Sequence, residues 1–507
     1  MCGILFSINS KHRVNRLQDA LKLMDHRGPD ATGVSSFDNN IFMGFKRLSI
    51  IDLSDEANQP FTIGHFHLIF NGELYNYKEL IIEHNLDIRT TSDTEVVLKM
   101  YQKYKENALD YFNGMFALVI YDEKKKDIFV ARDRLGIKPL YYSENAGELY
   151  YCSEIEPIKA LVETSFDNFA VRQYLKLRMT VKGHTIYDNI KMFPPGHYSI
   201  NGKITRYWDY SPELRSAPKN EELEWLISNS VDIRKRSDVP VGSYLSGGLD
   251  STILSYLLKP THTWTVGFEM MNEFNWGKLA NDGLGSIHHK TIVDSEQFVE
   301  TAKLMIQKRK EPLSVPNEVL IYLMTKNVKR NNTVVLSGEG ADELFWGYDR
   351  IFRWANEAAA FNIDEFDKMY SYGSQKDDEV IDFAISDLPG TTVLEKVAYY
   401  FQIHHLQGLL RRLDNSTMLC SVEARVPFVD HRLVELLAGS PIEWRMGSSI
   451  KQPLKNMFRK LIPAEIIDRK KIGFPVPLES IFPEQANRNT PMDRWLELNM
   501  KQLNIPI

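Results

Sequence analysis

Cysteine is scarce in this sequence, with Cys2, Cys152 and Cys420 the three examples among 507 residues. Their wide spacing excludes a disulfide framework and a cysteine-based metal cluster, and such low usage is typical of a reducing compartment. The longest purely apolar runs, such as Met115–Tyr121, are shorter than the roughly 20 residues that a membrane span needs. The first residues also lack the cationic stretch followed by an apolar one that marks a signal peptide. We therefore expect a cytoplasmic protein that does not bind a membrane.

An excess of charge of one sign is also lacking, since 61 Lys and Arg residues against 67 Asp and Glu residues give a formal net charge of −6. This small imbalance argues against a basic nucleic-acid binder, so we expect no nucleic-acid partner. We find no repeat of fixed period and no low-complexity tract. A hydrophobic content of 43% excludes disorder as the main state, and the length predicts two or three domains.

Short strand candidates dominate residues 1–205. They are rich in β-branched and aromatic residues, and turn signals such as Asn71-Gly72 and Asn201-Gly202 separate them. The clearest candidates are Ile41–Leu48, His65–Phe70, Phe116–Tyr121, Asp127–Arg132 and Leu149–Cys152. Between Tyr207 and Asn220 the composition shifts to proline, serine and charge, which marks a domain boundary.

The second part of the chain alternates between strand and helix patterns. The sequence predicts a helix over Glu221–Lys235, a buried strand over Val239–Leu245 and, after a glycine turn, a helix over Ser251–Leu258. The order strand, glycine turn, helix recurs from Thr333 onward, which is typical of a parallel α/β sheet. Helical periodicity dominates from residue 351 to about residue 460, and the last 25 residues are polar and weakly patterned.

The glycine turn after the first of these strands carries chemistry. Residues 245–251 (LSGGLDS) close an apolar strand and open a helix. Glycines there let backbone N–H groups converge, and the helix N-terminus adds positive potential, so phosphate is the natural ligand. The turn has no lysine but an aspartate, Asp250, and a carboxylate beside phosphates needs a divalent cation between them. A plain turn capped by Ser or Asp would also contain a glycine pair, but the whole string in this context favours nucleotide binding with Mg²⁺.

This string resembles the pyrophosphate loop of ATP pyrophosphatases, which cleave ATP between the α and β phosphates to form an adenylate. A second segment, residues 337–343 (SGEGADE), supports the resemblance. It implies that Asp250 and Asp342 hold Mg²⁺ on the departing pyrophosphate, where the metal stabilises the developing charge.

A cysteine directly after the initiator methionine is the other unusual feature. Removal of Met1 would leave the thiol of Cys2 and its own α-amine on one residue, with ordinary pKa values of about 8.5 and 8. The amine would then serve as general base for the thiol, as in N-terminal threonine nucleophiles. By position alone, an early cysteine usually has no function.

Several ordered motifs give Cys2 a role. They are residues 25–30 (DHRGPD), 47–50 (RLSI), 71–76 (NGELYN), 92–95 (SDTE) and 131–140 (ARDRLGIKPL). Singly they suggest a hairpin turn or surface charge pairs, but together they resemble the glutaminase domain of class II glutamine amidotransferases. The resemblance implies that Cys2 attacks the side-chain amide of glutamine, with an oxyanion hole from the Asn71 side chain and the Gly72 N–H.

The same resemblance implies a glutamine-binding set. Arg47 would bind the α-carboxylate of glutamine, and Asp93 would bind its α-ammonium with help from Glu73. The full set is Arg47, Ile50, Asn71, Gly72, Glu73 and Asp93.

A glutaminase followed by an ATP pyrophosphatase is similar to the asparagine synthetase family over nearly the full chain. The resemblance implies an αββα-sandwich N-terminal-nucleophile glutaminase domain of α+β class at residues 2–205. An α/β parallel-sheet ATP-pyrophosphatase domain with a helical C-terminal part would follow at residues 221–507. The implied reaction converts ATP, aspartate, glutamine and water into asparagine, glutamate, AMP and pyrophosphate. Ammonia would cross an internal tunnel to attack an acyl-adenylate, shielded from water and from protonation.

The family also implies the residues of the ATP site. Leu245, Val266 and Gly338 would contact adenosine. Glu339 would position the reacting acyl group or ammonia, and Lys451 would contact the α-phosphate, where a cation offsets developing charge. The further ATP-binding positions are Ser246, Gly247, Gly248, Asp250, Ser251 and Ser337. ATP and Mg²⁺ are the only cofactors that the resemblance implies.

The carboxylate acceptor is the open point. Residues 311–318 (EPLSVPNE) depart from the acceptor segment of aspartate-specific members and look more like relatives found with polysaccharide-building genes. The alternatives are asparagine synthesis and the same chemistry on another carboxylate, such as a sugar acid. A non-catalytic scaffold would have lost Cys2, Asp250, Asp342 or Lys451, and a β-lactam synthetase-like ring closure would leave Cys2 idle. The expected partners are small-molecule substrates, and a homodimer is an option that the sequence leaves open.

Overall fold

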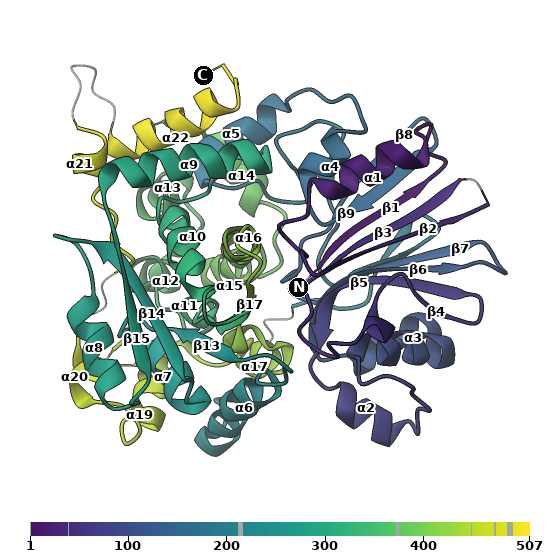
Figure 1. Ribbon diagram of the computed structural model, residues 1–507. Helices are drawn as coiled ribbons and strands as arrows, with labels where there is room; N and C mark the ends of the chain where they lie inside the picture. The colour runs from purple at the N-terminus through teal and green to yellow at the C-terminus, as the bar shows by residue number, and fades with distance from the viewer. Residues whose placement is uncertain are drawn as a thin grey trace.

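The structure is a computed structural model that describes residues 2–38, 40–210, 216–371, 375–447, 449–470, 473–483 and 490–506. Within these ranges the N-terminal half contains two antiparallel sheets, and the C-terminal half contains one parallel sheet surrounded by helices (Figure 1). This arrangement confirms the expected fold class, an α+β sandwich followed by an α/β part with a helical C-terminal region.

The two N-terminal sheets each have six strands in the described chain. One has the order β10-β8-β9-β1-β3-β2 and the other β12-β11-β7-β6-β5-β4. The strands are β1 (Gly3–Ile8), β2 (Ala31–Phe37), β3 (Ile41–Arg47), β4 (Phe61–Ile63), β5 (Phe66–Leu74), β6 (Gly114–Asp122), β7 (Asp127–Arg132), β8 (Tyr141–Asn145), β9 (Glu148–Cys152), β10 (Lys191–Met192), β11 (His197–Ile200) and β12 (Lys203–Arg206).

Apolar side chains fill the space between these sheets. Phe6 from β1 and Val119 from β6 belong to one buried cluster that joins both sheets, as expected where strands alternate inward and outward residues. Helices α1 and α4 contact the first sheet, and α3 contacts the second, so that helices cover the sandwich (Figure 1). The helices of this half are α1 (Val14–Lys22), α2 (Tyr77–Glu83), α3 (Asp93–Tyr104), α4 (Ile155–Lys159) and α5 (Asn168–Leu177).

The predicted strands of this half correspond to β3, β5, β6, β7 and β9, and the Asn201-Gly202 turn joins β11 to β12 as expected. The prediction of a turn at Asn71-Gly72 is wrong, because both residues lie inside β5 and pair with β6. A Cβ on Gly72 would lie 2.2 Å from the carbonyl oxygen of Met115. Glycine is therefore required there by the close approach of the neighbouring strand.

The C-terminal half is built on parallel strands in the order β15-β14-β13-β16-β17. They are β13 (Val241–Tyr244), β14 (His262–Phe268), β15 (Ile287–Val293), β16 (Val334–Leu336) and β17 (Glu423–Arg425). The predicted strand over Val239–Leu245 is β13, and the one from Thr333 is β16. Because the two strands are parallel neighbours, the glycine turns that follow them meet at the same edge of the sheet.

Helices surround this sheet and form the rest of the C-terminal half (Figure 1). They are α6 (Asn220–Ile233), α7 (Leu249–Leu258), α8 (Phe274–Asp282), α9 (Ser295–Arg309), α10 (Asn317–Val328), α11 (Ala341–Leu344), α12 (Asp349–Glu357), α13 (Ile363–Tyr370), α14 (Asp378–Ile385), α15 (Val393–Tyr399), α16 (Leu406–Met418), α17 (His431–Leu437), α18 (Ile442–Met446), α19 (Gln452–Phe458), α20 (Ala464–Asp468), α21 (Leu478–Ile481) and α22 (Pro491–Gln502). The weakly patterned C-terminal segment thus ends in a helix, α22. Its Trp495 and Met500 are buried, and the Trp495 ring packs against Phe298 of α9. Polar residues around them obscure the helical period in the sequence.

Buried ion pairs join the two halves. Asp414 on α16 accepts hydrogen bonds from Arg27 at 2.9 Å and from Lys138 at 3.2 Å, and all three side chains are almost fully buried. The hydroxyl of Ser421 donates to the backbone oxygen of His26 at 2.6 Å. Removing one member of such a buried pair leaves an uncompensated charge, so these contacts specify how the halves dock.

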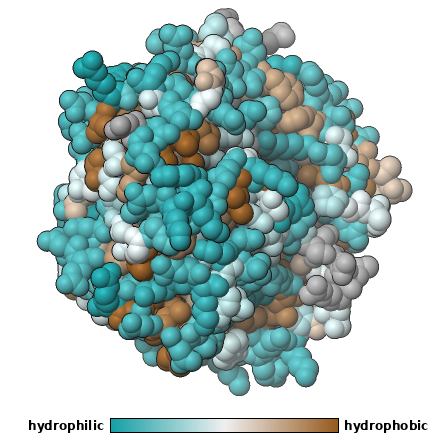
Figure 2. Space-filling model, turned by 90° about the vertical axis from the view of Figure 1, so that its right-hand side faces the viewer, coloured by the Kyte–Doolittle hydropathy of each residue, from teal (hydrophilic) through white to brown (hydrophobic). Residues whose placement is uncertain are grey.

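The outer face of the N-terminal half is mostly hydrophilic, with hydrophobic residues in small separate groups (Figure 2). Among the helices of the described chain, none is long and apolar enough to cross a membrane.

Candidate active sites

Cys2 lies in a small cavity of the N-terminal half, directly before β1. It is 8% exposed, and its backbone nitrogen donates to Asn71 Oδ1 at 3.1 Å. The cavity brings together most of the glutamine-binding residues expected from the sequence. Those that line it are Cys2, Arg47, Ile50, Gly72, Glu73 and Asp93. Asn71 completes the set through its contact with Cys2.

Arg47, the last residue of β3, is held in one orientation by backbone and amide oxygens. Its guanidinium donates to the carbonyl of Ser54 at 2.6 Å, to Asn58 Oδ1 at 2.9 Å and to the carbonyl of Asp52. None of these three partners is a carboxylate, so the positive charge of Arg47 is not neutralised by them and is available to an anionic ligand.

Two carboxylates lie on another side of the cavity. Asp93, the first residue of α3, accepts a hydrogen bond from the Leu74 N–H at 2.8 Å. Burial raises the pKa of Asp93 to about 6. Burial also raises the pKa of Glu73 well above its ordinary value, and repulsion from Glu423 adds to this, whereas Arg425 opposes it. Buried carboxylates of this kind favour a ligand with a positive charge, because it restores their ionised form.

The Cys2 thiol is not preactivated by its surroundings. Burial raises its pKa, the positive charge of the chain terminus and the backbone of Leu48 lower it, and Glu73 raises it further, with a net increase. A thiol in this state needs a base to become the nucleophile.

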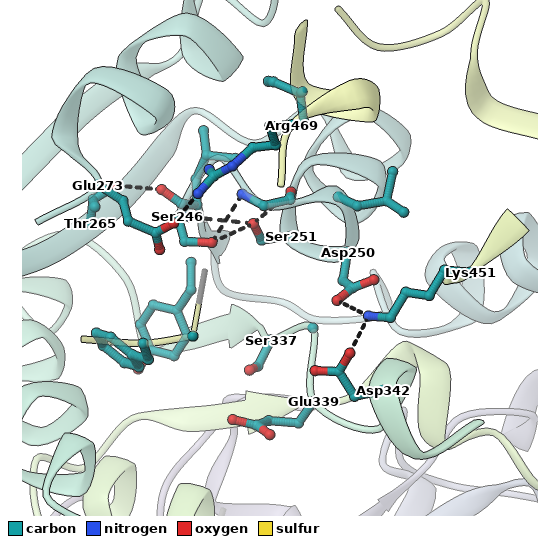
Figure 3. A pocket seen from close by; sticks show the side chains of 18 of the residues that line it. Ser246, Asp250, Ser251, Thr265, Glu273, Ser337, Glu339, Asp342, Lys451 and Arg469 are labelled. Carbon is teal, nitrogen blue, oxygen red and sulfur yellow. Dashed lines mark hydrogen bonds and ion pairs between the residues drawn. The ribbon is translucent and has the colours of Figure 1, made fainter. Parts of the chain in front are cut away.

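The second site is a cavity of about 540 Å³ at the carboxyl ends of β13, β14 and β16 (Figure 3). Most residues expected to bind ATP line it, together with the expected catalytic residues Glu339 and Lys451 and the expected metal ligand Asp342. They are Leu245, Ser246, Gly248, Asp250, Ser251, Val266, Ser337, Gly338, Glu339, Asp342 and Lys451. Gly247 is the exception: it has φ of 74°, and a Cβ there would lie 2.3 Å from the backbone of Trp276. Its role is conformational, since a side chain would not fit.

The turn at Ser246 forms a compact cradle. Ser246 Oγ accepts from the Gly248 N–H at 3.2 Å and contacts Ser251 Oγ at 3.1 Å. Helix α7 begins at Leu249 directly behind the turn, so its N-terminus points positive potential at the cavity. This arrangement suits a phosphate group.

Lys451 lies between the two acidic residues predicted to hold a metal (Figure 3). Its Nζ contacts Asp250 Oδ2 at 2.5 Å and Asp342 Oδ1 at 2.6 Å, and its side chain is buried. Burial lowers the pKa of Lys451, but the two carboxylates outweigh burial and raise it overall. The residue before α19 therefore carries a permanent positive charge next to the cradle.

These carboxylates also fit a divalent cation. They converge on one cationic atom, and their oxygens are the hard donors that Mg²⁺ prefers. Across the described chain no group of three or more His, Cys, Asp or Glu residues could hold a metal. Mg²⁺ at a phosphate site is usually bound by one or two carboxylates together with the phosphates and water, so this pair fits such a site.

Two arginines are absent from the sequence expectations: Arg469 lines this cavity, whereas Arg412 lies outside its lining and contacts it through Glu339. Arg469 donates to the carbonyl of Gly247 at 2.9 Å and pairs with Glu273 (Figure 3). Arg412 on α16 donates to Asn317 Oδ1 at 3.0 Å and pairs with Glu339. Neither arginine stands in a motif that a single sequence reveals, because its partners lie far away along the chain.

Two family models match the chain: a glutamine amidotransferase domain over residues 1–209 and asparagine synthase over residues 222–491. The chain belongs to the asparagine synthase family. It is 30% identical to "Asparagine synthetase [glutamine-hydrolyzing] 1" of Bacillus subtilis, over 96% of this chain and 89% of that protein. It is 29% identical to "Asparagine synthetase B [glutamine-hydrolyzing]" of Escherichia coli, over 89% of this chain and 77% of that protein.

Among solved structures, glutamine phosphoribosylpyrophosphate amidotransferase from B. subtilis matches with a TM-score of 0.33 and 14% identity, over 68% of this chain and 77% of that one. The family membership makes the chain an ATP-dependent carbon–nitrogen ligase with a glutamine amidotransferase domain.

Proposed function

We propose that this chain is a glutamine-dependent asparagine synthetase of the cytoplasm, with a glutaminase domain at residues 2–205 and a synthetase domain at residues 221–507. One observation carries the proposal. The two docked halves of the chain each contain a site. One is a cavity with a thiol, an arginine and two buried carboxylates, and the other is a phosphate cradle with two carboxylates and a lysine. The first cavity suits the zwitterionic end of an amino acid, and the second suits ATP.

In the first step, Cys2 Sγ attacks the side-chain amide carbon of glutamine. The Asn71 amide and the Gly72 N–H stabilise the charge on the amide oxygen, each for about 3–4 kcal/mol of the barrier. Arg47 binds the α-carboxylate, and Asp93 with Glu73 binds the α-ammonium next to Ile50. Since burial raises the thiol pKa, the α-amine of Cys2 serves as its base once Met1 is removed. The hydrogen bond to Asn71 Oδ1 orients that nitrogen.

In the second step, a carboxylate of the acceptor attacks the α-phosphate of ATP. The 246–251 turn holds the phosphates, while Leu245, Val266 and Gly338 contact the adenosine. Lys451 offsets charge that develops at the α-phosphate, and Glu339 positions the acyl group or the ammonia. Asp250 and Asp342 would hold Mg²⁺, which when bound neutralises charge on the leaving pyrophosphate.

Collapse of the Cys2 adduct breaks the carbon–nitrogen bond and releases ammonia, and water then hydrolyses the remaining thioester to glutamate and the free thiol. The ammonia passes within the chain from the first site to the second, where it attacks the acyl carbon and displaces AMP. Its route crosses the docked interface, where Asp414 pairs with Arg27 and Lys138 out of contact with solvent. Enclosure keeps ammonia unprotonated and the acyl-adenylate away from water.

The experiment is to incubate the protein with MgATP, glutamine and aspartate and to measure asparagine, glutamate and pyrophosphate. The proposal requires asparagine and pyrophosphate to form in equal amounts. Glutamate release without asparagine would refute aspartate as the acceptor but keep the glutaminase.

A second candidate keeps this chemistry but amidates another carboxylate, such as a sugar acid. Asn317, at the end of the segment that departs from aspartate-specific members, contacts the Arg412 that pairs with Glu339. The changed segment therefore adjoins the acceptor side of the site. Pyrophosphate release with ammonia and a sugar acid, but not with aspartate, would support this candidate.

A further inference from the structure

The loop after Arg47 rests on the C-terminal half of the chain. Asp238, in the connection between α6 and β13, holds it from both sides: the Asp238 N–H donates to the carbonyl of Ile50 at 2.8 Å, and the Asp52 N–H donates to Asp238 Oδ2 at 2.7 Å. Asp52 has φ of 55°, a left-handed conformation that a non-glycine residue adopts when its contacts impose it. Asp238 thus fixes the shape of this turn.

That turn sets the position of Arg47. The carbonyl of Asp52 accepts a hydrogen bond from Arg47 Nη2, and the carbonyl of Ser54 accepts one from Nη1. The Asp52 carboxylate is itself engaged by the N–H of Ser54 and that of Thr91, at 3.1 and 2.9 Å. A shift of the Asp52 backbone would therefore move the guanidinium that faces the cavity.

Arg425, the last residue of β17, contacts Glu73, which lines the same cavity. Its Nη2 lies 3.5 Å from Glu73 Oε2, and its Nη1 donates to the carbonyls of Arg234 and Arg236 at 2.8 and 2.6 Å. These carbonyls belong to the segment that leads to Asp238. The backbone oxygen of Arg425 accepts from the Ser337 N–H at 2.9 Å, so the same residue also touches the loop of the ATP cavity.

We propose that Asp238 and Arg425 are positioning residues of the glutamine site, through which the C-terminal half holds Arg47 and Glu73 in the geometry that binds glutamine. The inference rests on the proposed glutaminase function. Neither residue lines the cavity around Cys2. Each acts through a neighbour, so its loss weakens binding of glutamine more than it slows the attack by Cys2.

The test compares Asp238→Ala with Asp238→Asn in the full-length protein, using glutamate release at varied glutamine concentration. Asp238 is exposed, so neither change removes core packing. In Asp238→Ala we expect the KM for glutamine to rise about tenfold, while kcat changes less than about twofold. A tenfold rise in KM corresponds to the loss of one hydrogen bond to a charged group. Asp238→Asn keeps an oxygen for the Asp52 N–H and should stay within about twofold of the parent. The matched control is Asp232→Ala, since Asp232 is exposed and pairs with Lys235 within its own half.

Arg425→Lys should raise the same KM, because a lysine keeps the charge but not the planar fork that joins Glu73 to two carbonyls. An active Asp238→Ala variant with an unchanged KM for glutamine would overturn this inference and leave the proposed function intact. The same holds if kcat and the melting temperature fall together in Asp238→Ala and Asp238→Asn does not restore them. A parent protein that releases no glutamate, or a Cys2→Ala variant that still does, would overturn the proposed function and this inference with it.

Discussion

Replacing Lys451 by methionine tests the ATP site most directly. Methionine keeps much of the side-chain length and removes the charge that Asp250 and Asp342 share at 2.5 and 2.6 Å. If that charge faces the α-phosphate, its loss should reduce the rate of adenylate formation by about 10²–10³-fold, the range seen when one preorganised transition-state partner is removed. The assay is exchange of labelled pyrophosphate into ATP, which needs neither glutamine nor ammonia. Lys460→Met is the matched control, because Lys460 is exposed on the same part of the chain.

The same substitution has a second consequence that depends on the metal. It leaves two carboxylates facing each other, and since they are 21% and 25% exposed the cost to stability should be about 1–3 kcal/mol, below that of a fully buried pair. A divalent cation can replace the lost ammonium, so added Mg²⁺ should raise the melting temperature of Lys451→Met more than that of the parent. Exchange within threefold of the parent, together with no extra response to Mg²⁺, would refute both the assignment of Lys451 and that of the carboxylate pair.

Three further predictions address the other parts of the chain. Cys2→Ala should abolish glutamine-dependent amidation and leave ammonia-dependent amidation unchanged, measured as pyrophosphate release with each donor; loss of both would contradict two separate sites. Because burial raises the pKa of Asp93 to about 6, its ionisation destabilises the folded state as pH rises through about 4 to 6. Asp93→Asn should therefore be up to about 3 kcal/mol more stable than the parent at pH 8 and equal to it below pH 4 in urea titrations, while binding glutamine poorly. Asp414→Asn leaves Lys138 without its buried carboxylate and Arg27 with Glu154 alone, and should cost about 3–5 kcal/mol in the same titrations. A cost below about 1 kcal/mol would contradict the buried ion pairs.

Local sequence strings predicted most of the two sites, because each site is built largely from contiguous turns. The 245–251 and 337–343 segments each follow a strand, and parallel pairing of β13 with β16 brings them together without further information. The same logic failed at Asn71-Gly72. The composition of this dipeptide favours a turn, but glycine is required within a strand because Met115 approaches it closely. The dipeptide alone does not predict that contact.

Contacts between the halves could not be predicted in this way. Arg27 and Asp414 are 387 residues apart, and no periodicity or motif relates them. The roles of Arg469 and Asp238 likewise depend on contacts that are distant in sequence. Arg469 contacts Gly247, and Asp238 contacts the turn at residues 50–52. Helix α22 was missed because its core contacts depend on a few buried residues such as Trp495 within a polar segment.

The two sites share one electrostatic device, which bears on how binding in each can be selective. Each contains a pair of carboxylates that must be neutralised in the free protein: Lys451 does this for Asp250 and Asp342, and raised pKa values do it for Glu73 and Asp93. A ligand that brings its own cation to these carboxylates displaces the neutralising group, either a proton or the lysine ammonium, and so is favoured over a ligand that does not. In the proposed function, glutamine brings an ammonium to the first pair, and ATP with a divalent cation would free Lys451 for the phosphates at the second. Discrimination in both sites therefore depends on charge exchange. This predicts that binding of glutamine releases fewer protons as the pH rises above the pKa of Asp93 of about 6. Calorimetry of glutamine binding to an acylation-deficient Cys2→Ala protein, in buffers of different ionisation enthalpy, measures this. The expected result is that binding releases more protons at pH 6 than at pH 8.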